Sequence, residues 1–378
     1  MQASRRRSSV STGRLRNNLH YFTKGQQVVR VGIIGYGFVT KTFHLPLIGA
    51  SEGIEVSAIC SSRPEVVRAE QPGIVVFDSP EALVASAAVD VVLIASTNDT
   101  HASHARLALA AGKHVIVEKP FALGLAEARE LVAAAEAAGR LITVFQNRRW
   151  DSDFLSVKAA IEDGSLGRVV QFESHFDRFQ ASGGDRWWEK EAPGSGIWFD
   201  LAPHLVDQAL QLFGLPDSVQ VNLANLRDGS LVDDWAHAVL NYPRLRVILQ
   251  ASTIVSGGSP RFIVHGDRGT LVKPRLDNQE NQLLRGVVPG SGEWGRDPDD
   301  VLRWTIDGTQ SCEAARPGDQ RGFYRALVQA VNHGAPSPVQ PHEAIAVMAI
   351  IEAGFASSAQ GRAMAPDLTA AERAAWTR

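Results

Sequence analysis

One feature of this sequence constrains its fold more than any other: short apolar runs alternate with helical stretches between residues 28 and 145. Strands that are apolar throughout are expected in a parallel sheet, because helices cover both of its faces. The predicted strands are Val28–Ile34, Ile54–Cys60, Val75–Phe77, Val89–Ala95, His114–Val117 and Leu141–Phe145. The predicted helices between them include Phe38–Ala50, Thr100–Ala111 and Leu125–Ala138. The pattern predicts an α/β domain with a doubly wound parallel sheet of the Rossmann type.

The rhythm changes after Trp150, where longer β-like runs follow one another without helices between them. Such runs predict a second, α+β domain with a mostly antiparallel sheet. Its strands are expected at Arg168–Phe179, Ser218–Ala224, Trp235–Tyr242, Leu245–Thr253, Arg261–His265 and Thr270–Lys273. Residues 274–320 are rich in Gly, Pro and Asp and are predicted to form a long loop. Helices at Gly322–Asn332 and His342–Ala359 are predicted to close the fold.

Charge and composition exclude several classes of function. The 378 residues carry a formal net charge of −3, which gives no electrostatic reason to bind nucleic acid or a membrane. No apolar run approaches the roughly 18 residues that span a bilayer. The only two cysteines, Cys60 and Cys312, form no metal or redox motif, so a reducing, cytoplasmic compartment is expected.

The amino-terminal segment differs from the rest of the chain. Its first 29 residues hold six Lys/Arg and no acidic residue. A disordered basic leader over residues 1–28, or a misplaced start codon, is the favoured interpretation. A targeting segment and a nucleic-acid-binding arm are the alternatives.

A glycine-rich turn follows the first predicted strand. In Gly35-Tyr36-Gly37, the first glycine suits a tight backbone turn and the second lets a pyrophosphate approach the next helix. Thr40 replaces the third glycine of the common dinucleotide pattern. An ordinary strand–helix turn is the alternative, but the strand and helix on either side favour dinucleotide binding.

The second strand ends in Ser61-Ser62-Arg63 rather than in an acid. An acid at this place usually accepts a hydrogen bond from the ribose of NAD, whereas hydroxyls and an arginine can bind a 2′-phosphate. The sequence therefore favours NADP over NAD, with a solvated loop arginine as the alternative. The residues expected to contact the cofactor are Gly35, Gly37, Phe38, Val39, Ser61, Ser62, Arg63, Ser96, Thr97, Asn98, His101, Glu118, Lys119 and Asn147.

Three residues have the chemistry to handle the proton of an alcohol. Lys119 follows a predicted strand at the same sheet edge as the glycine turn, and a cis Lys119-Pro120 bond would aim it into the cleft. Asp200 and His204 lie four apart, on one face of a predicted helix. Pro203 requires this helix to begin nearby or to kink.

Each of these residues has an expected role. His204 is the best single candidate for the general base, with a pKa near working pH. Asp200 is expected to pair with Lys119 or position the substrate hydroxyl, and Asp207 to orient His204 or cap local structure. A solvent-exposed polar helix face is the alternative. No metal site is expected, because no cysteine assists these side chains.

These motifs together resemble the Gfo/Idh/MocA oxidoreductases over about residues 30–360. The resemblance rests on the glycine turn, on Glu118-Lys119-Pro120 and on the stretch from Gly194 to Asp207. It implies that Lys119, Asp200 and His204 form the catalytic group and that an open sheet in the second domain makes homodimer or homotetramer contacts. Ala202 replaces a glycine that is usual in the family.

Three further stretches resemble the branch of NADP-dependent scyllo-inositol 2-dehydrogenases: Phe145–Asp151, Phe172–Phe179 and Gly258–Gly266. This resemblance implies a cyclic polyol, its inosose or a sugar as the substrate. The side chains expected to contact it are Arg148, Arg149, His175, Arg178 and Trp188. The alternatives are a non-catalytic NAD(P)-sensing regulator on the same scaffold and an NAD-using glycosidase.

The domain boundaries follow from these assignments. The dinucleotide-binding domain is expected at residues 29–150, and the substrate and oligomerisation domain at 151–340. A closing helix at 341–362 is expected to pack back on the protein.

Overall fold

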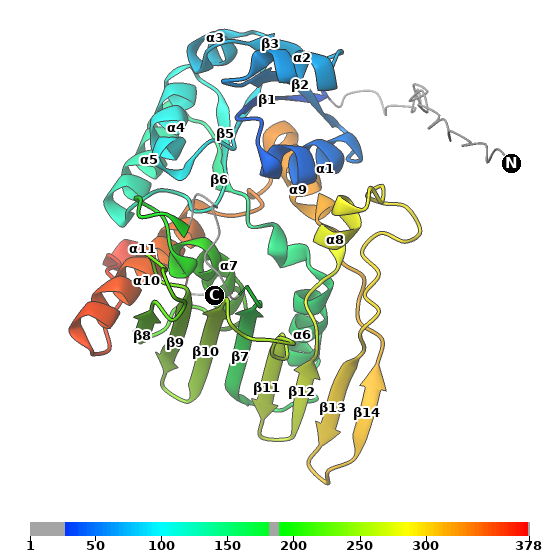
Figure 1. Ribbon diagram of the computed structural model, residues 1–378, viewed down its shortest axis with the longest axis vertical. Helices are drawn as coiled ribbons and strands as arrows, with labels where there is room; N and C mark the ends of the chain where they lie inside the picture. Colours follow the sequence, from blue (N-terminus) through cyan, green and yellow to red (C-terminus); the bar gives the residue numbers. More distant parts are fainter. Residues whose placement is uncertain (1–26, 181–188, 377–378) are drawn as a thin grey trace, which may run out of the picture.

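The computed structural model describes residues 27–180 and 189–376, which form two sheets with helices packed around them (Figure 1). The predicted leader, apart from its last two residues, lies outside the described residues, and so does Trp188. Within the described ranges, no helix is both long and apolar enough to cross a membrane.

The amino-terminal sheet confirms the predicted Rossmann architecture. Its six strands are all parallel, in the order β3-β2-β1-β4-β5-β6. They are β1 (Val29–Ile34), β2 (Ile54–Cys60), β3 (Val75–Phe77), β4 (Val91–Ile94), β5 (His114–Val117) and β6 (Ile142–Val144). Because parallel strands end at a common edge, the glycine turn, Ser61 and Lys119 are all brought to one side of the sheet.

Helices cover both faces of this sheet, as its apolar strands require (Figure 1). One face carries α3 (Pro80–Ala85), α4 (His101–Ala110) and α5 (Leu125–Ala138), and α2 (Pro64–Glu70) joins β2 to β3. The other face carries α1 (Leu45–Gly49) and α9 (Arg321–His333). Helix α9 was expected with the second domain, yet it packs on β1 and α1.

The first predicted helix, Phe38–Ala50, is divided. A π-helix, η1 (Thr40–His44), precedes α1, and the Leu45 amide bonds to the carbonyl of Thr40, five residues back. Pro46 has no N–H to continue the usual helical pattern across this junction. The wider turn brings the buried His44 into the sheet edge that carries Lys119.

The carboxy-terminal sheet has eight strands in the order β14-β13-β12-β11-β7-β10-β9-β8. Its neighbours are antiparallel except for β7 and β10, which confirms a mostly antiparallel sheet. The strands are β7 (Val169–Asp177), β8 (Ser218–Ala224), β9 (Trp235–Tyr242), β10 (Leu245–Ser252), β11 (Phe262–Gly266), β12 (Gly269–Lys273), β13 (Val301–Thr305) and β14 (Gln310–Glu313).

Three helices cover one face of this sheet: α6 (Ser152–Glu162), α7 (Ile197–Phe213) and α10 (Pro341–Gln360). Helix α10 also packs against α5 and β6, so it joins the two sheets. Two short 3₁₀ turns, η2 (Asn98–Thr100) and η3 (Asn147–Trp150), follow β4 and β6 at the edge that carries Lys119. A short helix, α11 (Ala370–Ala374), lies near the end of the chain.

One prediction about this half of the chain was wrong. Residues 274–320 are not one long loop, because they form α8 (Gln279–Leu284) and the edge strands β13 and β14. Strand β14 is exposed throughout, so it lacks the alternation that reveals a strand. Helix α7 begins well before Pro203. Its first turn is held by Asp233, whose carboxylate accepts from the Trp198 amide at 2.7 Å and whose carbonyl accepts from the Ile197 amide at 2.8 Å.

Candidate active site

Lys119 meets helix α7 although 81 residues separate it from Asp200. The Lys119 Nζ lies 2.7 Å from Asp200 Oδ1 and 3.0 Å from the Asp200 carbonyl oxygen. The Lys119-Pro120 bond is cis, as the sequence suggested. The lysine and the aspartate are therefore brought together as expected.

The Asp200 carboxylate is held in its charged form. Burial acts to raise the pKa of Asp200, but the charge and hydrogen bond of Lys119, together with the charges of Arg178 and Arg148, outweigh it, so the pKa lies below its usual value. Both side chains retain about a fifth of their exposure, at 21% each. The pair is thus ionised and still open to a small molecule.

His204 lies one helical turn beyond Asp200 and is buried, with 5% of its surface exposed. Its Nδ1 lies 3.1 Å from Gln146 Oε1, while Gln146 Nε2 donates to the Pro203 carbonyl at 3.2 Å. The second bond fixes the orientation of the amide, so its oxygen faces the imidazole. His204 therefore carries its proton on Nδ1, and Nε2 is left as an acceptor.

The pKa of His204 lies well below its usual value, because burial and then the positive charges of Arg148 and Lys119 disfavour the imidazolium. The sequence predicted a pKa near working pH, and this prediction was wrong, because the number of cations around the ring is visible only in three dimensions. The imidazole is neutral at working pH and can accept a proton.

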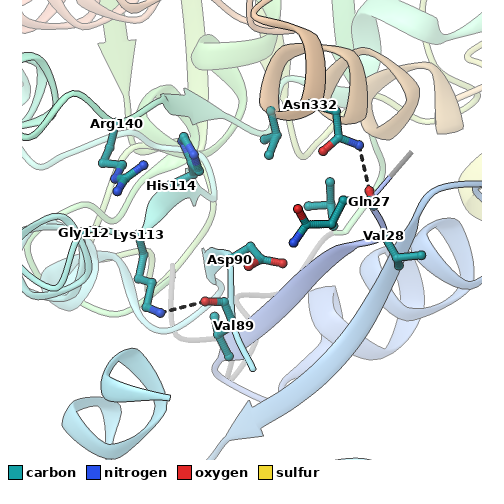
Figure 2. Close-up of a pocket in the computed structure, with 11 residues that line it drawn as sticks. Gln27, Val28, Val89, Asp90, Gly112, Lys113, His114, Arg140 and Asn332 are labelled. Carbon is teal, nitrogen blue, oxygen red and sulfur yellow. Dashed lines mark hydrogen bonds between the residues drawn. The ribbon is translucent and has the colours of Figure 1, made fainter. Parts of the chain in front are cut away.

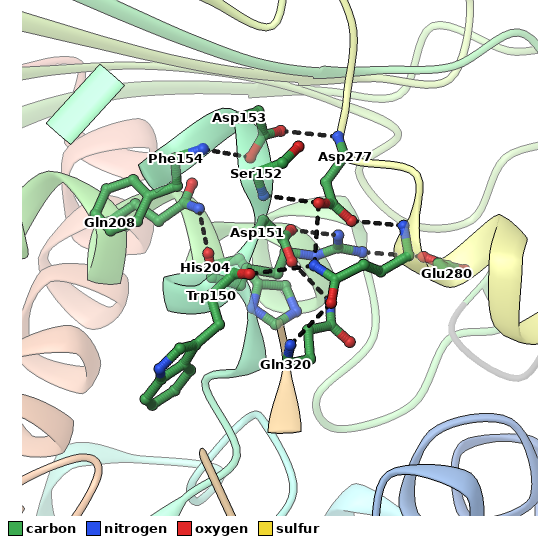
Figure 3. A network of polar contacts seen from close by, with 12 residues as sticks. Trp150, Asp151, Ser152, Asp153, Phe154, His204, Gln208, Asp277, Glu280 and Gln320 are labelled. Atoms are coloured by element: carbon green, nitrogen blue, oxygen red, sulfur yellow. Dashed lines mark hydrogen bonds and ion pairs between the residues drawn. The ribbon is translucent and has the colours of Figure 1, made fainter. Parts of the chain in front are cut away.

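A buried polar network fixes the turn that carries Arg148 (Figure 3). Arg148 binds Asp151 at 3.2 Å and Glu280 at 3.1 Å, and Gln208 Nε2 donates to its carbonyl at 2.9 Å. The Asp277 carboxylate accepts from the Ser152 amide at 2.7 Å, and burial followed by the nearby Asp153 raises the pKa of Asp277 to about 6. Figure 3 shows His204 beside this network. The positive charge of Arg148 acts on the imidazole.

Arg149 and Asp207 bind each other rather than the Lys119–Asp200–His204 group. The Arg149 guanidinium binds Asp207 at 2.6 and 2.8 Å and Glu343, at the start of α10, at 2.9 Å. Asp207 therefore does not orient His204, which is bonded by Gln146, a residue that the sequence analysis did not single out. Gln146 lies within Phe145–Asp151, one of the stretches that carry the family resemblance. That stretch was the only sequence feature that could have indicated a role for it.

Strand alternation separates two of the expected substrate residues. Phe176 of β7 faces α7, with its ring centroid 6.5 Å from that of His204. Its neighbour His175 therefore points to the opposite face of the sheet, where it lies 3.2 Å from Glu173. Arg178 lies two residues beyond Phe176 and lines a small cavity of about 30 Å³ together with Asp200. We therefore keep Arg178 near the site and place His175 outside it.

The glycine turn has the shape that a dinucleotide requires. Gly35 has φ = +108°, and a Cβ there would lie 2.3 Å from the Ala95 carbonyl oxygen, so only glycine fits. A Cβ on Gly37 would meet nothing within 4 Å, which leaves open space above the turn. Thr40, which replaces the third glycine, donates its hydroxyl to the Gly35 carbonyl at 2.9 Å. Phe38 is 58% exposed beside the turn, and Val39 is half-buried.

Ser62 and Arg63 are exposed at the end of β2, and the Ser61 hydroxyl accepts from the Arg63 amide at 3.1 Å. The fold also brings in an acid that no sequence motif indicated. Glu70, at the end of α2, lies 2.9 Å from the Tyr36 hydroxyl and 2.7 Å from Lys41 Nζ. Arg63 adds to the positive charge around this carboxylate.

The remaining expected cofactor residues line the same edge but differ in their contacts. Ser96 Oγ lies 3.1 Å from His104 Nδ1, and Asn98 donates to the Gly194 carbonyl at 3.1 Å. His101 is buried between the carbonyls of Pro120 and Ser96, at 2.8 and 3.3 Å, so it fixes the backbone next to Lys119. Burial lowers the pKa of His101. Three residues complete the edge, namely the exposed Thr97 and the buried Glu118 and Asn147.

A larger cavity of about 240 Å³ opens at the opposite edge of the parallel sheet (Figure 2). It is lined by Asp90, Lys113, His114 and Arg140, which precede or begin strands. Ligands of doubly wound sheets bind at the carboxyl ends of the strands, so this cavity is on the wrong edge for the cofactor. Across residues 27–180 and 189–376, no cluster of three His, Cys, Asp or Glu side chains is arranged to hold a metal ion.

Two sequence models of one oxidoreductase family match the chain. The family's NAD-binding Rossmann fold matches residues 29–146, and its C-terminal alpha/beta domain matches residues 158–365. The chain belongs to the Gfo/Idh/MocA oxidoreductase family. The family match and the observed sheets agree on a nucleotide-binding Rossmann sheet followed by an α/β domain.

Relatives of this Gfo/Idh/MocA protein align over nearly their whole length. An uncharacterized oxidoreductase of Escherichia coli K12, YdgJ, is 46% identical over 87% of this chain and 96% of its own. The scyllo-inositol 2-dehydrogenase (NADP(+)) IolW of Bacillus subtilis is 34% identical over 88% of this chain and 95% of its own. A solved Klebsiella pneumoniae structure described as an oxidoreductase is 50% identical, with a TM-score of 0.88, and covers 93% of this chain and 98% of that one.

Proposed function

We propose that this protein is an NADP-dependent dehydrogenase that transfers a hydride between nicotinamide and a ring carbon of a cyclic polyol, such as scyllo-inositol or its inosose, or of a sugar. The observation that carries the proposal is the ionised Lys119–Asp200 pair, one helical turn from a neutral His204 with an unprotonated Nε2. The NADP-linked relative IolW supports both the cofactor and the substrate class.

Each catalytic side chain has a proposed task. NADP, when bound beside these residues, would supply the hydride-transfer chemistry. His204 Nε2 accepts the proton of the substrate hydroxyl, and the Lys119 ammonium stabilises the negative charge that develops on that oxygen. Asp200 holds the ammonium in place by two hydrogen bonds. Arg148 and Arg178 are proposed to bind further ring hydroxyls, while Arg149 and His175 are left out because of their other contacts.

NADP is proposed because the residues around its expected site fit it. The open space above Gly37 admits a pyrophosphate, and Ser62 and Arg63 are exposed donors beside it. A 2′-phosphate is bound well by a guanidinium and hydroxyls. Glu70 is neutralised by Lys41, so it does not oppose a phosphate with an unpaired charge.

The proposed units of the chain are a dinucleotide-binding domain at residues 29–150, a substrate and oligomerisation domain at 151–340 and the joining helix α10. Helix α9 lies within the second of these ranges in sequence but packs on β1 and α1, so the segment 321–333 is proposed to belong to the dinucleotide-binding unit in space. The two cysteines are unpaired, with Cys60 buried and Cys312 exposed, which supports the cytoplasm as the proposed compartment.

A homodimer or homotetramer is also proposed. Alternate residues of β7, β9 and β10 face the helices and are buried, while those between them are half-exposed on the other face. This second face includes Trp235 stacked on His237, with ring centroids 6.1 Å apart. Light scattering of the full chain should give the mass of two or four copies, and a monomer would contradict this part of the proposal.

The decisive experiment is a panel of inositols, inososes and aldoses with NADP(H) and NAD(H), followed at the nicotinamide absorbance band. Turnover of a polyol or sugar with NADP supports the proposal. Cofactor binding without turnover of any compound favours a sensor. Release of a free sugar from a glycoside without net cofactor reduction favours a glycosidase.

A further inference from the structure

A buried chain of hydrogen bonds ends at the backbone of Lys119. The Tyr324 hydroxyl lies 2.5 Å from His44 Nδ1, and His44 Nε2 lies 2.8 Å from Glu118 Oε1. The other carboxylate oxygen, Glu118 Oε2, accepts from the Lys119 amide at 3.0 Å. The chain joins three segments that are distant in sequence: η1, the end of β5 and α9.

The side chains that form this series of hydrogen bonds are shielded from water. Tyr324 and His44 have no exposed surface, and Glu118 has 6%. Phe145 packs against the imidazole, with ring centroids 4.5 Å apart, and Phe323 packs against Phe145 at 4.9 Å. A buried carboxylate is costly without partners, so these contacts determine where the Glu118 side chain lies.

One arrangement of protons satisfies every group. The Tyr324 hydroxyl donates to His44 Nδ1, and His44 Nε2–H donates to the Glu118 carboxylate, which in turn accepts from the Lys119 amide. The histidine is then neutral and of a single tautomer. Tyr324 restricts the orientation of the His44 ring, and His44 restricts the position of the Glu118 carboxylate. Glu118 in turn holds the backbone amide of Lys119, the residue whose side chain carries the ammonium.

We propose that His44 and Tyr324 are positioning residues that aim Lys119 at the substrate through Glu118. This inference rests on the proposed function of Lys119 but assigns residues that lie outside the catalytic group. Helix α9 therefore contributes to the active site without touching it. Loss of the chain leaves Lys119 free to shift, and a displacement of about 1 Å can lower a rate on the order of 100-fold.

The test compares four full-length variants. His44→Phe removes both hydrogen bonds of the imidazole, and His44→Gln restores a donor to Glu118. Tyr324→Phe removes only the hydroxyl. Tyr242→Phe is the matched control, since Tyr242 is another buried tyrosine, whose hydroxyl donates to the Gly214 carbonyl at 2.9 Å in the second domain.

The first readout does not require a substrate. The labelling rate of Lys119 with an N-hydroxysuccinimide ester is followed against pH by peptide mass spectrometry and is normalised to the half-exposed Lys158. His44→Phe and Tyr324→Phe should change the Lys119 profile, while His44→Gln and Tyr242→Phe should resemble the parent. An unchanged Lys119 profile in both His44→Phe and Tyr324→Phe overturns the inference.

The second readout is kinetic. With any substrate that the panel identifies, His44→Phe should lower kcat on the order of 10- to 100-fold with an unchanged KM for NADP, and His44→Gln should recover most of it. Equal loss in the two His44 variants indicates a structural role and overturns the inference. If no compound turns over, the proposed function fails while the labelling profiles still decide the role of His44.

Discussion

The Lys119 ammonium donates to two acceptors of one residue, the Asp200 carboxylate at 2.7 Å and the Asp200 carbonyl at 3.0 Å. An ammonium has three N–H donors, so this geometry orients two of them and leaves the third for a ligand. Asp200 in turn is fixed by its place in the first turn of α7. The pair, with 21% of each side chain exposed, thus presents one directed positive donor to a ligand.

Replacing Lys119 with methionine should lower turnover by about 100- to 10,000-fold, because the donor that stabilises the developing charge is lost. NADP binding, measured by calorimetry, should change little. Lys158→Met is the matched control, since Lys158 pairs only loosely with Glu162 at 3.9 Å on α6. Turnover within threefold of the parent would contradict a catalytic role for Lys119.

Replacing Gln146 with glutamate should move the pH profile of alcohol oxidation. A carboxylate beside Nδ1 favours the imidazolium and raises the pKa of His204. The reaction requires the neutral ring, so the acidic limb of kcat/KM should shift to higher pH. Gln146→Leu should instead lower kcat, because the tautomer is no longer fixed. Profiles that coincide with the parent in both variants would refute the role assigned to Gln146.

Replacing Asp207 with asparagine separates stability from catalysis. Arg149 is largely but not fully buried, with 10% of its side chain exposed, and it loses its bidentate partner, which should lower the free energy of unfolding by about 3 kcal/mol. The contact of Arg149 with Glu343 remains, so the fold should persist. Urea unfolding measures the loss, and kcat at 25 °C should stay near that of the parent. A stable variant with lost activity would indicate that Asp207 takes part in catalysis.

The sequence predicted those strands and site residues that are determined by their neighbours along the chain. All six parallel strands were found, because each is an apolar run next to turn or helix signals. Lys119 and Asp200 could be paired in advance, since one follows a strand at the ligand edge and the other begins a helix. Gly35 could be assigned because the glycine turn lies between a predicted strand and a predicted helix, and its φ of +108° agrees with that assignment.

The contacts that the sequence did not reveal depend on how distant segments pack. Asp207 and His204 are three residues apart on one helix, but Asp207 binds Arg149 whereas His204 hydrogen-bonds with Gln146. His175 is one residue from Phe176, yet it faces the other side of the sheet. The buried partners of Glu118 come from residues 44 and 324. No local pattern specifies such pairs.

Replacing Arg63 with aspartate should shift cofactor preference from NADP toward NAD. The change removes a guanidinium that can bind a 2′-phosphate and adds a carboxylate that can accept from a ribose hydroxyl. The ratio of kcat/KM for NADP to that for NAD should fall at least about tenfold. Arg68→Asp, on helix α2 just after Arg63, is the control, because Arg68 pairs with Asp78 at 3.2 Å. An unchanged ratio in Arg63→Asp would place the phosphate elsewhere.

The buried His204 should also make stability depend on pH. Its pKa in the folded protein lies well below 6.5, owing first to burial and then to Arg148, Lys119, Arg261 and Arg178 around the ring. In the unfolded chain the imidazole takes up a proton below about pH 6.5, whereas in the folded protein it does not. The contribution of His204 to the free energy of unfolding is therefore fully present above that pH and decreases as pH falls.

One proton corresponds to at most about 1.4 kcal/mol per pH unit. His204→Asn should remove this slope between about pH 6.5 and the lower folded pKa, measured by urea unfolding at half-unit steps of pH. His101, His104, His114 and His237 also have lowered pKa values, but they contribute equally to the parent and to the variant. The difference between the two curves therefore isolates His204. Parallel curves would mean that His204 takes up protons equally in the folded and unfolded states, and this would contradict the lowered pKa that burial and the surrounding cations give it.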